Sequence, residues 1–443
     1  MSSLLQDLIT ARVEQHPDAA AIVSSDATVT YAELEARSNQ VARMLREHGC
    51  RRGDRIAVLS PATSAAVVAT LGILKADAIC VPLDPADSVA AQVAAVQLVR
   101  PAGLLLARSS ASQVDQLLRA GAIGTAALFG ALERDRVAGQ LFATAFALKD
   151  LDKLSKRAPA ARNRATNPAW VQFRREGTGL PLGVVATHSG LARSLVWSAT
   201  HFGVRPGDRH AAVSPLAGVR SVHETLGAFV GGATLFPVPS AVNGQPRRLA
   251  DFVRRSGLTM WLTSADALTA LASADVVAPA DFPALRHVVW ADGTIGRAAL
   301  HYWVTRVKHV EFTSLYGVPE ATIASAFYTW PKDELPAADM APVGTPCPGR
   351  EVLVLNDQLQ LAAAAETGDI WIRGAGLSPG YWADPLATDS AFKQGPGGGS
   401  RGERMCKTGD RGHRDHLGRI FLGAAAVPGL TPDTGSSNGR AVA

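Results

Sequence analysis

Two kinds of apolar segment alternate along most of the chain, and this alternation limits the fold more than any other feature. DRIAVLS (54–60) and ICVPLDP (79–85) are short and apolar like buried strands, whereas SAAVVATLGILKA (64–76) has the length of a helix. Parallel strands need such a crossover, so this order favours a parallel sheet with helices on its faces. Thr30 and Glu33 form a capping box that predicts a helix start.

The same alternation returns in the second part of the chain. AWVQF (169–173), RHAAVSP (209–215) and TLFPV (234–238) are predicted strands with helices between them, and the pattern continues to HVEFTSLYG (309–317). After residue 346 only short strands separated by turn residues follow. The sequence predicts an α/β fold with two doubly wound, mixed or parallel sheet subdomains packed together, plus a small β subdomain.

Changes in composition predict where these parts begin and end. The polar stretch from Lys153 to Pro168 is interpreted as a linker or boundary. This gives a first α/β subdomain at 1–168, a second at 169–345 and the small β subdomain at 346–423. GPGGGSRGE (395–403) is predicted to be a flexible loop, and 424–443 a disordered tail.

Composition argues against several classes of function. The 443 residues carry a net charge of only +5, and Lys and Arg form no stripe of the kind that binds nucleic acid. No apolar run reaches the roughly 18 residues of a membrane span. The N-terminus has no signal-peptide pattern, so we expect a cytoplasmic protein that binds neither membranes nor nucleic acid.

Three short motifs are candidates for chemistry, although each has an ordinary structural explanation. EGTGLPLGVV (176–185) resembles loops that hold phosphate with backbone N–H groups, but it also suits any strand-to-helix turn. YGVPE (316–320) and KTGD (407–410) could equally be a loop closure and a β-turn. Their order and separation make them informative.

Together with longer motifs, they resemble the adenylate-forming superfamily, and most closely the adenylation domains of nonribosomal peptide synthetases. The longer motifs include TVTYAELEARSNQVARML (28–45) and GDIWIRGAGLSPGYWADPLATDSAF (368–392). The resemblance covers about residues 1–423. In this family a carboxylate attacks the α-phosphorus of ATP, and an acyl-adenylate forms as pyrophosphate leaves.

The resemblance implies an ATP site made by the three short motifs. Its catalytic residues would be Thr178 and Glu320, and Glu320 would also hold Mg²⁺, a cation that prefers oxygen ligands. Tyr316 would stack near the adenine, and Asp410 would accept hydrogen bonds from the ribose hydroxyls. The implied ATP-binding set is Gly177, Thr178, Gly179, Gly183, Tyr316, Gly317 and Asp410.

An acid pocket is implied as well, made by Val219, Arg220, His223 and Leu315. Members that activate amino acids hold the α-amino group with an aspartate, and the aligned residue here is Val219. A protonated amine would have no counter-charge there, so we expect an acid without an α-amino group. Arg220 and His223 could meet an anionic or polar substrate, or they could simply have drifted.

The phosphate loop departs from the family pattern. The usual lysine is Leu182, and Glu176 adds a negative charge beside the phosphates. Arg174 or Arg175 could compensate, because guanidinium binds phosphate well, or the loop could have lost its grip on ATP. Pro319 replaces the threonine before Glu320 and removes a backbone donor. The mobile C-terminal domain of the family, with its lysine, has no counterpart after GRIFLG (418–423).

Two functions therefore stay open. The first is a ligase that activates a carboxylic acid with ATP and Mg²⁺; a separate C-terminal domain could complete it, or this sequence could be a truncated form of a longer chain. The second is a catalytically impaired pseudoenzyme that serves as a binding or scaffold module in a biosynthetic assembly. The expected partners are a small carboxylic acid and a carrier protein or synthetase subunit.

Overall fold

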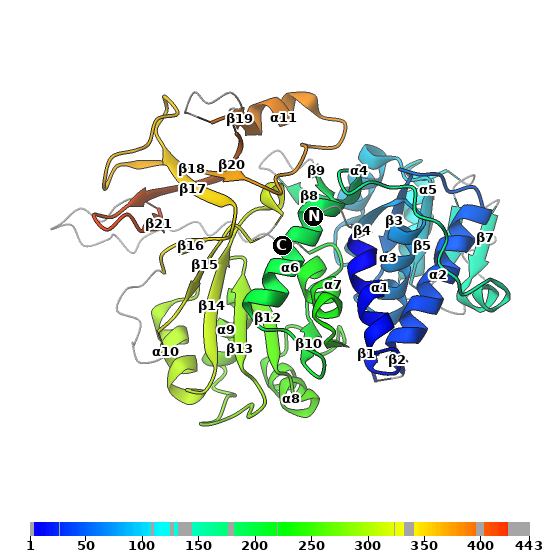
Figure 1. Ribbon diagram of the computed structural model, residues 1–443, viewed down its shortest axis with the longest axis horizontal. Coiled ribbons are helices and arrows are strands. Elements are labelled where there is room, and N and C mark those ends of the chain that lie inside the picture. The colour runs from blue at the N-terminus through cyan, green and yellow to red at the C-terminus, as the bar shows by residue number, and fades with distance from the viewer. Residues whose placement is uncertain are drawn as a thin grey trace.

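The computed structural model describes residues 4–25, 27–107, 110–124, 128–131, 144–175, 181–218, 220–322, 324–331, 341–395 and 403–423. Its strands form three sheets, and Figure 1 shows them with helices packed between and against them. The predicted α/β class, with two large sheets and a small β part, is confirmed. Most of the predicted flexible loop and the tail at 424–443 lie outside the described residues.

The seven-stranded sheet contains the strands of the first predicted strand–helix–strand units. Neighbouring strands from β3 to β8 are parallel, and β9 pairs antiparallel with β8. In spatial order the strands are β7 (Thr144–Ala147), β6 (Leu128–Ala131), β5 (Gly103–Leu106), β3 (Arg55–Leu59), β4 (Ile79–Leu83), β8 (Pro168–Arg175) and β9 (Pro181–Thr187).

The nine-stranded sheet combines strands from both ends of the large α/β part. β1 pairs in parallel with β11, with Ile22 opposite Leu235. In spatial order the strands are β16 (Thr345–Pro346), β15 (Ala326–Thr329), β14 (Glu311–Tyr316), β13 (His287–Ala291), β12 (Met260–Ser264), β10 (Arg209–Ala212), β11 (Thr234–Pro237), β1 (Ala20–Val23) and β2 (Thr28–Thr30).

The third sheet is small and antiparallel, and it lies at the upper left in Figure 1. Its central strand β20 pairs with β18, β19 and β21. The strands are β17 (Arg350–Leu355), β18 (Thr367–Gly374), β19 (Phe392–Gln394), β20 (Arg404–Arg414) and β21 (Ile420–Leu422). Helix α11 (Pro385–Ala391) leads into β19.

The helices complete the layers, and the largest core joins strands of both large sheets. That core includes Leu34, Leu71 and Phe229, which are fully buried. The other α-helices are α1 (Leu5–Gln15), α2 (Tyr31–Glu47), α3 (Ser64–Lys75), α4 (Val89–Val99), α5 (Ala111–Arg119), α6 (His188–His201), α7 (Ser221–Gly231), α8 (Pro246–Ser256), α9 (Ala265–Ser273) and α10 (Arg297–Arg306); the short 3-10 helices are η3 (Leu148–Lys153) and η4 (Pro319–Ala321). None of the described helices is long and apolar enough to span a bilayer.

Local signals are reproduced closely. The capping box is present: the Thr30 hydroxyl oxygen accepts from the Glu33 N–H at 3.2 Å, and Glu33 Oε2 accepts from the Thr30 N–H at 2.9 Å. The helix ends at Glu47, just before Gly49 with its φ of +92°. These features depend on residues within one or two turns of each other, which the sequence displays directly.

Sheet membership crosses the boundary predicted at residue 168 in both directions. β8 and β9 belong to the sheet of β3 to β7, whereas β1 and β2 belong to the sheet of β10 to β16. The division into 1–168, 169–345 and 346–423 therefore stays a prediction.

The segment predicted as a linker is held against the first helices. Residues 154–167 contain neither helix nor strand. Arg46 Nη1 donates to the carbonyl oxygen of Ala160 at 3.0 Å, and Asp77 Oδ1 accepts from the N–H groups of Arg162 and Asn163, each at 3.0 Å. This segment is a strap across the ends of α2 and α3.

Candidate functional site

Residues of the predicted motifs converge from all three sheets. Arg174 lies near the end of β8 in the seven-stranded sheet. Glu320 lies in η4, directly after β14 of the nine-stranded sheet. Thr408 and Asp410 belong to β20 of the five-stranded sheet. Hydrogen bonds from the Arg174 guanidinium to the Glu320 side chain and to the Thr408 backbone bring these distant parts of the sequence to one place.

Arg174, Glu320, Tyr381 and Thr408 form a connected group that we call the Arg174 junction. Arg174 Nη1 donates to Glu320 Oε1 at 2.9 Å, and Nη2 donates to the Thr408 carbonyl oxygen at 3.1 Å. The Tyr381 hydroxyl donates to the same Oε1 at 2.7 Å. The Glu320 side chain is 0% exposed, so the guanidinium compensates a carboxylate that would otherwise be buried without a counter-charge.

The second oxygen of Glu320 differs from the first. Oε2 is buried and has no hydrogen-bond partner among the described residues. A buried acceptor without a partner costs about 1–3 kcal/mol, so this oxygen could still accept a hydrogen bond or contact a cation.

Beside the junction, Tyr316 and Asp410 contact each other. The Tyr316 hydroxyl donates to Asp410 Oδ2 at 2.8 Å. Burial, together with the Asp410 carboxylate, raises the pKa of Tyr316, so the hydroxyl stays protonated and acts as a donor. The pair joins β14 to β20 and brings together the residues predicted for adenine and ribose. Gly317 follows Tyr316 and is half-buried.

The glycine loop lies only partly within the described residues. Gly177, Thr178 and Gly179 lie outside them, as does Glu176. Gly183 is buried on β9, and a Cβ there would lie 3.1 Å from Val171 Cγ1 and 3.2 Å from Trp382 Cβ. Its carbonyl oxygen accepts from the Trp382 N–H at 2.6 Å. Glycine at this position therefore lets β9 pack closely against the segment that follows β18.

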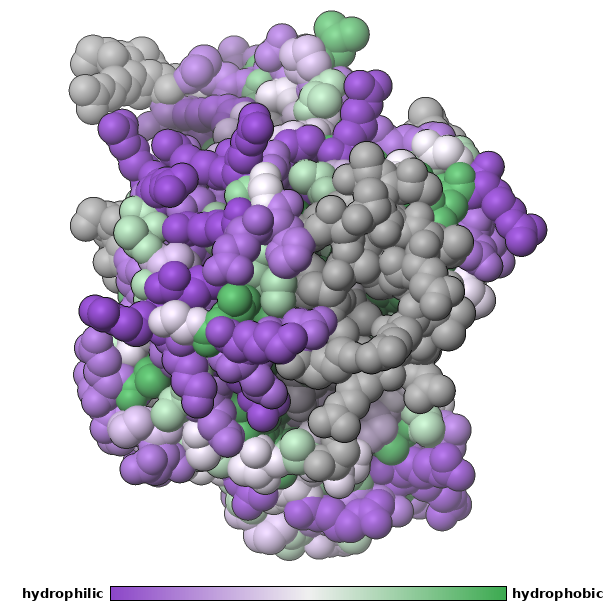
Figure 2. All heavy atoms as spheres, turned by 90° about the vertical axis from the view of Figure 1, so that its right-hand side faces the viewer, coloured by the Kyte–Doolittle hydropathy of each residue, from purple (hydrophilic) through white to green (hydrophobic). Residues whose placement is uncertain are grey.

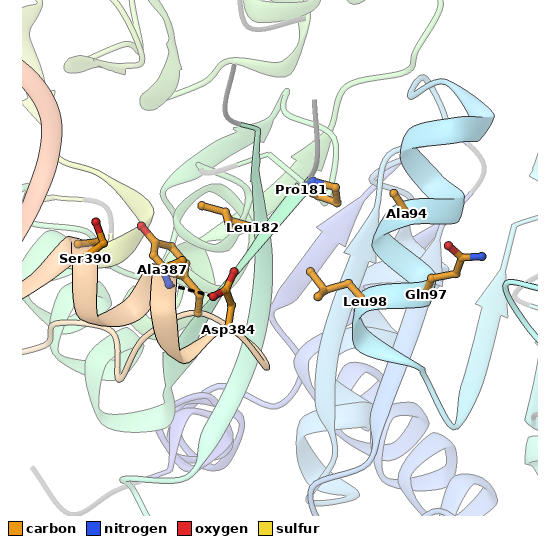
Figure 3. A pocket seen from close by; sticks show the side chains of 10 residues that line it. Ala94, Gln97, Leu98, Pro181, Leu182, Asp384, Ala387 and Ser390 are labelled. Carbon is orange, nitrogen blue, oxygen red and sulfur yellow. Dashed lines mark hydrogen bonds between the residues drawn. The ribbon is translucent and has the colours of Figure 1, made fainter. Parts of the chain in front are cut away.

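Leu182 packs against apolar neighbours. It adjoins a core cluster that includes Val184 and Tyr381. Figure 3 shows Leu182 on the wall of a groove of about 630 Å³ between β9, α4 and α11. Its lining residues are Ala94, Gln97, Leu98, Pro181, Leu182, Tyr381, Asp384, Ala387, Ser390 and Ala391. The groove wall near Leu182 combines apolar side chains with the polar side chains of Gln97, Asp384 and Ser390.

Pro319 is accommodated without loss of a backbone hydrogen bond. It is the first residue of η4, where an N–H group has no partner within the helix. Glu320 follows it into the junction. The substitution that looked costly in the sequence therefore suits the local backbone.

Arg220, predicted for the acid pocket, is engaged by other side chains. It precedes α7 and donates to Glu224 Oε1 at 3.3 Å and to the Ser214 hydroxyl at 2.9 Å, and it pairs with Asp292. The guanidinium thus ties the start of α7 to neighbouring loops. Val219, the residue before it, lies outside the described residues.

His223 and Leu315 are both buried. His223 Nε2 lies 2.9 Å from the Ser194 hydroxyl, and His223 borders a cavity of about 10 Å³, room for about one water molecule. Burial, reinforced by the positive charge of Arg350, lowers the pKa of His223 to about 4, so the ring is neutral. Leu315 packs with Met260 and Val289 in a separate core cluster.

Two contributions to the junction were not predicted. Tyr381 lies in the motif at 368–392 but was given no role. The place of Arg174 follows from strand pairing: Arg174 lies directly opposite Leu182 in the β8–β9 register. Arg174 and Leu182 lie four positions before and four positions after Thr178. A hairpin centred on Thr178 would therefore have predicted this pair.

The family profile described as AMP-binding enzyme matches residues 9–382, most of the chain. The chain belongs to the AMP-binding enzyme family. Its similarity to members of this family extends over nearly the whole sequence. It is 28% identical to tyrocidine synthase 2 of Brevibacillus parabrevis, over 94% of this chain and 11% of that protein. It is 30% identical to novobiocin biosynthesis protein H of Streptomyces niveus, over 95% of this chain and 66% of that protein.

Solved structures of the family share the fold. The AMPPNP-bound form of the nonribosomal peptide synthetase FmoA3 superposes with a TM-score of 0.81 and 26% identity. The match covers 96% of this chain and 43% of that one. The chain thus spans about a tenth of tyrocidine synthase 2 and less than half of FmoA3. The predicted membership of this family, close to adenylation domains, is confirmed.

Magnesium fits the junction poorly. Mg²⁺ is small, needs near-octahedral oxygen ligands and keeps several waters, so it requires an open approach to its carboxylate. Glu320 is enclosed, and one of its oxygens already accepts from a guanidinium and a hydroxyl. Arg174 would also repel a dication that approached the same carboxylate. The donor set suits a resident cationic side chain better than a hydrated metal ion.

Proposed function

We propose that this chain binds ATP where its three sheets meet and activates a small carboxylic acid as an acyl-adenylate. The observation that carries the proposal is the convergence of Tyr316, Asp410 and the Arg174 junction from three sheets. Membership of the AMP-binding enzyme family supports it, as does the AMPPNP-bound form of FmoA3. The proposal includes a cytoplasmic location, where ATP is available.

Within this proposal each group has a role that suits its chemistry. Tyr316 offers a ring face to the adenine, and the Asp410 carboxylate accepts from ribose hydroxyls. Arg174 offers N–H donors and a fixed positive charge to phosphate oxygens, which eases the approach of an anionic carboxylate. Gly177, Thr178 and Gly179 supply backbone N–H groups for phosphate. Catalysis then rests on positioning and charge neutralisation.

The acid is proposed to lack an α-amino group, because Val219 offers no counter-charge to an ammonium. Arg220 is already paired with Glu224 and Asp292, which argues against its use as an anchor for a second carboxylate. A neutral or aromatic carboxylic acid therefore suits these residues best. The proposed partners are a carrier protein or synthetase subunit, since tyrocidine synthase 2 and FmoA3 are named as synthetases.

The test combines calorimetry with ATP–pyrophosphate exchange. We expect ATP and a stable acyl-adenylate analogue to bind, and Asp410→Ala to weaken both by at least tenfold. Asp369→Ala is the matched control, because Asp369 lies in the same sheet and pairs with Lys407. If one carboxylic acid of a test panel stimulates ATP–pyrophosphate exchange, the chain activates that acid. Absence of binding by either ligand to folded protein would refute the proposal.

A second candidate is a binding module without turnover. The saturated Oε1 of Glu320 favours it, because a metal would have to compete with Arg174 for that carboxylate. The same experiment separates the two functions. Nucleotide binding without exchange for any acid, in the presence of an intact family C-terminal domain, would favour the module.

A further inference from the structure

The guanidinium of Arg174 is held in place by hydrogen bonds to two other residues. It is held on one side by the buried Glu320 carboxylate and on another by the Thr408 carbonyl oxygen. Both terminal nitrogens of the side chain are engaged, and 28% of the side chain is exposed, so part of it stays accessible to solvent. A guanidinium held in this way presents a positive charge with little loss of side-chain entropy when an anion binds.

Gly409 makes room for this guanidinium. It lies between Thr408 and Asp410 with a φ of +90°, and a Cβ at this position would lie 2.8 Å from Arg174 Nη2. That is closer than a carbon and a nitrogen can approach, so any other residue would push Arg174 away. KTGD lies within strand β20 rather than in a β-turn, at the point where the register with β18 shifts, so Gly409 accommodates both this irregularity and the arginine on β8.

The same arginine lies opposite the position where the family lysine is missing. Arg174 and Leu182 are direct partners in the antiparallel β8–β9 pair. Directly opposite residues extend from the same face of the sheet, with Cβ atoms about 5 Å apart. The positive charge that Leu182 lacks is therefore present on the neighbouring strand, one strand spacing away.

We propose that Arg174 replaces a divalent cation at this site, so that a nucleoside polyphosphate binds here without a metal ion. The inference rests on the proposed nucleotide site. Glu320 then serves as a positioning residue that holds the guanidinium through Oε1. The ligand class is a metal-free nucleotide anion, bound through its phosphate oxygens by Arg174.

The first experiment measures ATP affinity by calorimetry in EDTA and in excess Mg²⁺. In the wild-type chain we expect the two dissociation constants to differ by threefold or less. Arg174→Gln frees the Glu320 carboxylate, so Mg²⁺ should now tighten binding by more than tenfold. Adding Glu320→Gln to that variant should return the ratio to threefold or less. A wild-type ratio above threefold in favour of Mg²⁺ overturns the proposal.

The second experiment follows Mn²⁺ by electron paramagnetic resonance without nucleotide, so it does not depend on the proposed function. We expect no stoichiometric Mn²⁺ site in the wild type and one in Arg174→Gln that Glu320→Gln removes. A wild-type Mn²⁺ site that Glu320→Gln abolishes overturns the proposal, with the unpartnered Oε2 as the ligand. If Arg174→Gln does not fold, the wild-type and Glu320→Gln measurements decide.

The calorimetric and Mn²⁺ experiments distinguish failure of the proposed function from failure of the proposed metal replacement. If ATP binds in neither condition, the proposed function fails, and the Mn²⁺ result alone decides whether Arg174 or a metal compensates Glu320. If ATP binds only with Mg²⁺, the nucleotide site stands and the replacement of the metal by Arg174 is refuted.

Discussion

Among single residues, Gly409 is the one whose replacement reports most directly on the Arg174 junction. An alanine side chain there would force the guanidinium that contacts Glu320 and Thr408 to shift. Gly418 provides a matched control, since its φ is +79° and a Cβ would meet nothing within 4 Å. The two substitutions share the backbone strain and differ in the contact with Arg174.

We predict that Gly418→Ala lowers the free energy of unfolding by about 1–2 kcal/mol through backbone strain alone. Gly409→Ala should cost the same strain and, in addition, weaken ATP binding by at least tenfold, whereas Gly418→Ala should leave binding unchanged. Urea denaturation and calorimetry measure the two effects. Equal ATP affinities in the two variants would show that the position of Arg174 does not matter for binding.

The residues of the site could be predicted to very different extents. Tyr316, Glu320 and Asp410 lie in motifs, so their proximity was expected from the resemblance. The contact of Arg174 with Glu320 depends on the pairing of two strands and on the backbone of a third sheet, which no local pattern encodes. Arg220 looked available in the sequence, but partners such as Asp292 are distant along the chain and only the fold brings them together.

Among the elements, the strap at 154–167 is held in part by one buried carboxylate, that of Asp77. Asp77 is 1% exposed, has a φ of +64°, and accepts from Arg46 as well as from two backbone N–H groups of the strap. The strap was interpreted as a linker because its composition is polar. Composition does not reveal that a buried aspartate accepts from two of its backbone N–H groups.

We predict that Asp77→Asn lowers the free energy of unfolding by about 2–4 kcal/mol, because an amide places N–H donors opposite existing donors. Asp275→Asn is the control: Asp275 has a φ of +48° and pairs with Arg306, but its side chain is 68% exposed. Loss of that exposed pair should cost less than about 1 kcal/mol. Chemical denaturation of both variants checks the difference, and similar costs would contradict the role given to burial.

In the whole molecule, three buried histidines make stability depend on pH. Burial lowers the pKa of His188, His210 and His223 to about 4. In the unfolded chain these rings have a pKa near 6.5, so the unfolded state binds more protons between about pH 6.5 and pH 4. Stability is therefore full above about pH 6.5 and is lost as the pH falls through this window.

We predict that each of these histidines costs about 2 kcal/mol of stability at pH 5 relative to pH 7.5. Urea denaturation at both pH values measures the loss, and His223→Gln should reduce it by about the share of one histidine. His301→Gln, at an exposed position of α10, is the control. A loss that His223→Gln leaves unchanged would remove His223 as a cause.

On one face of the molecule, the described residues form no large apolar patch to which the proposed carrier protein could bind. Figure 2 shows that hydrophilic side chains cover most of the coloured part of that face, with hydrophobic residues as small separate spots. The large hydrophobic side chains that are exposed in the described part of the chain lie far apart in the sequence: Val89 in α4, Leu386 in α11, and Leu361 and Leu417 in loops. On the coloured part of this face, the proposed carrier protein would meet mainly polar side chains.

The pairing of β1 with β11 also has a consequence for how the chain is made. Ile22 cannot pair with Leu235 until Leu235 has been synthesised, roughly 210 residues later in the sequence. At about 5–20 residues per second, the ribosome would complete β11 some 10–40 seconds after β1. During that interval β1 has only its hairpin partner β2, so one edge of an apolar strand stays open. Strand β1 is thus enclosed on both sides only after about another 210 residues have been made, and chaperones that shield nascent chains would have to cover it during that time.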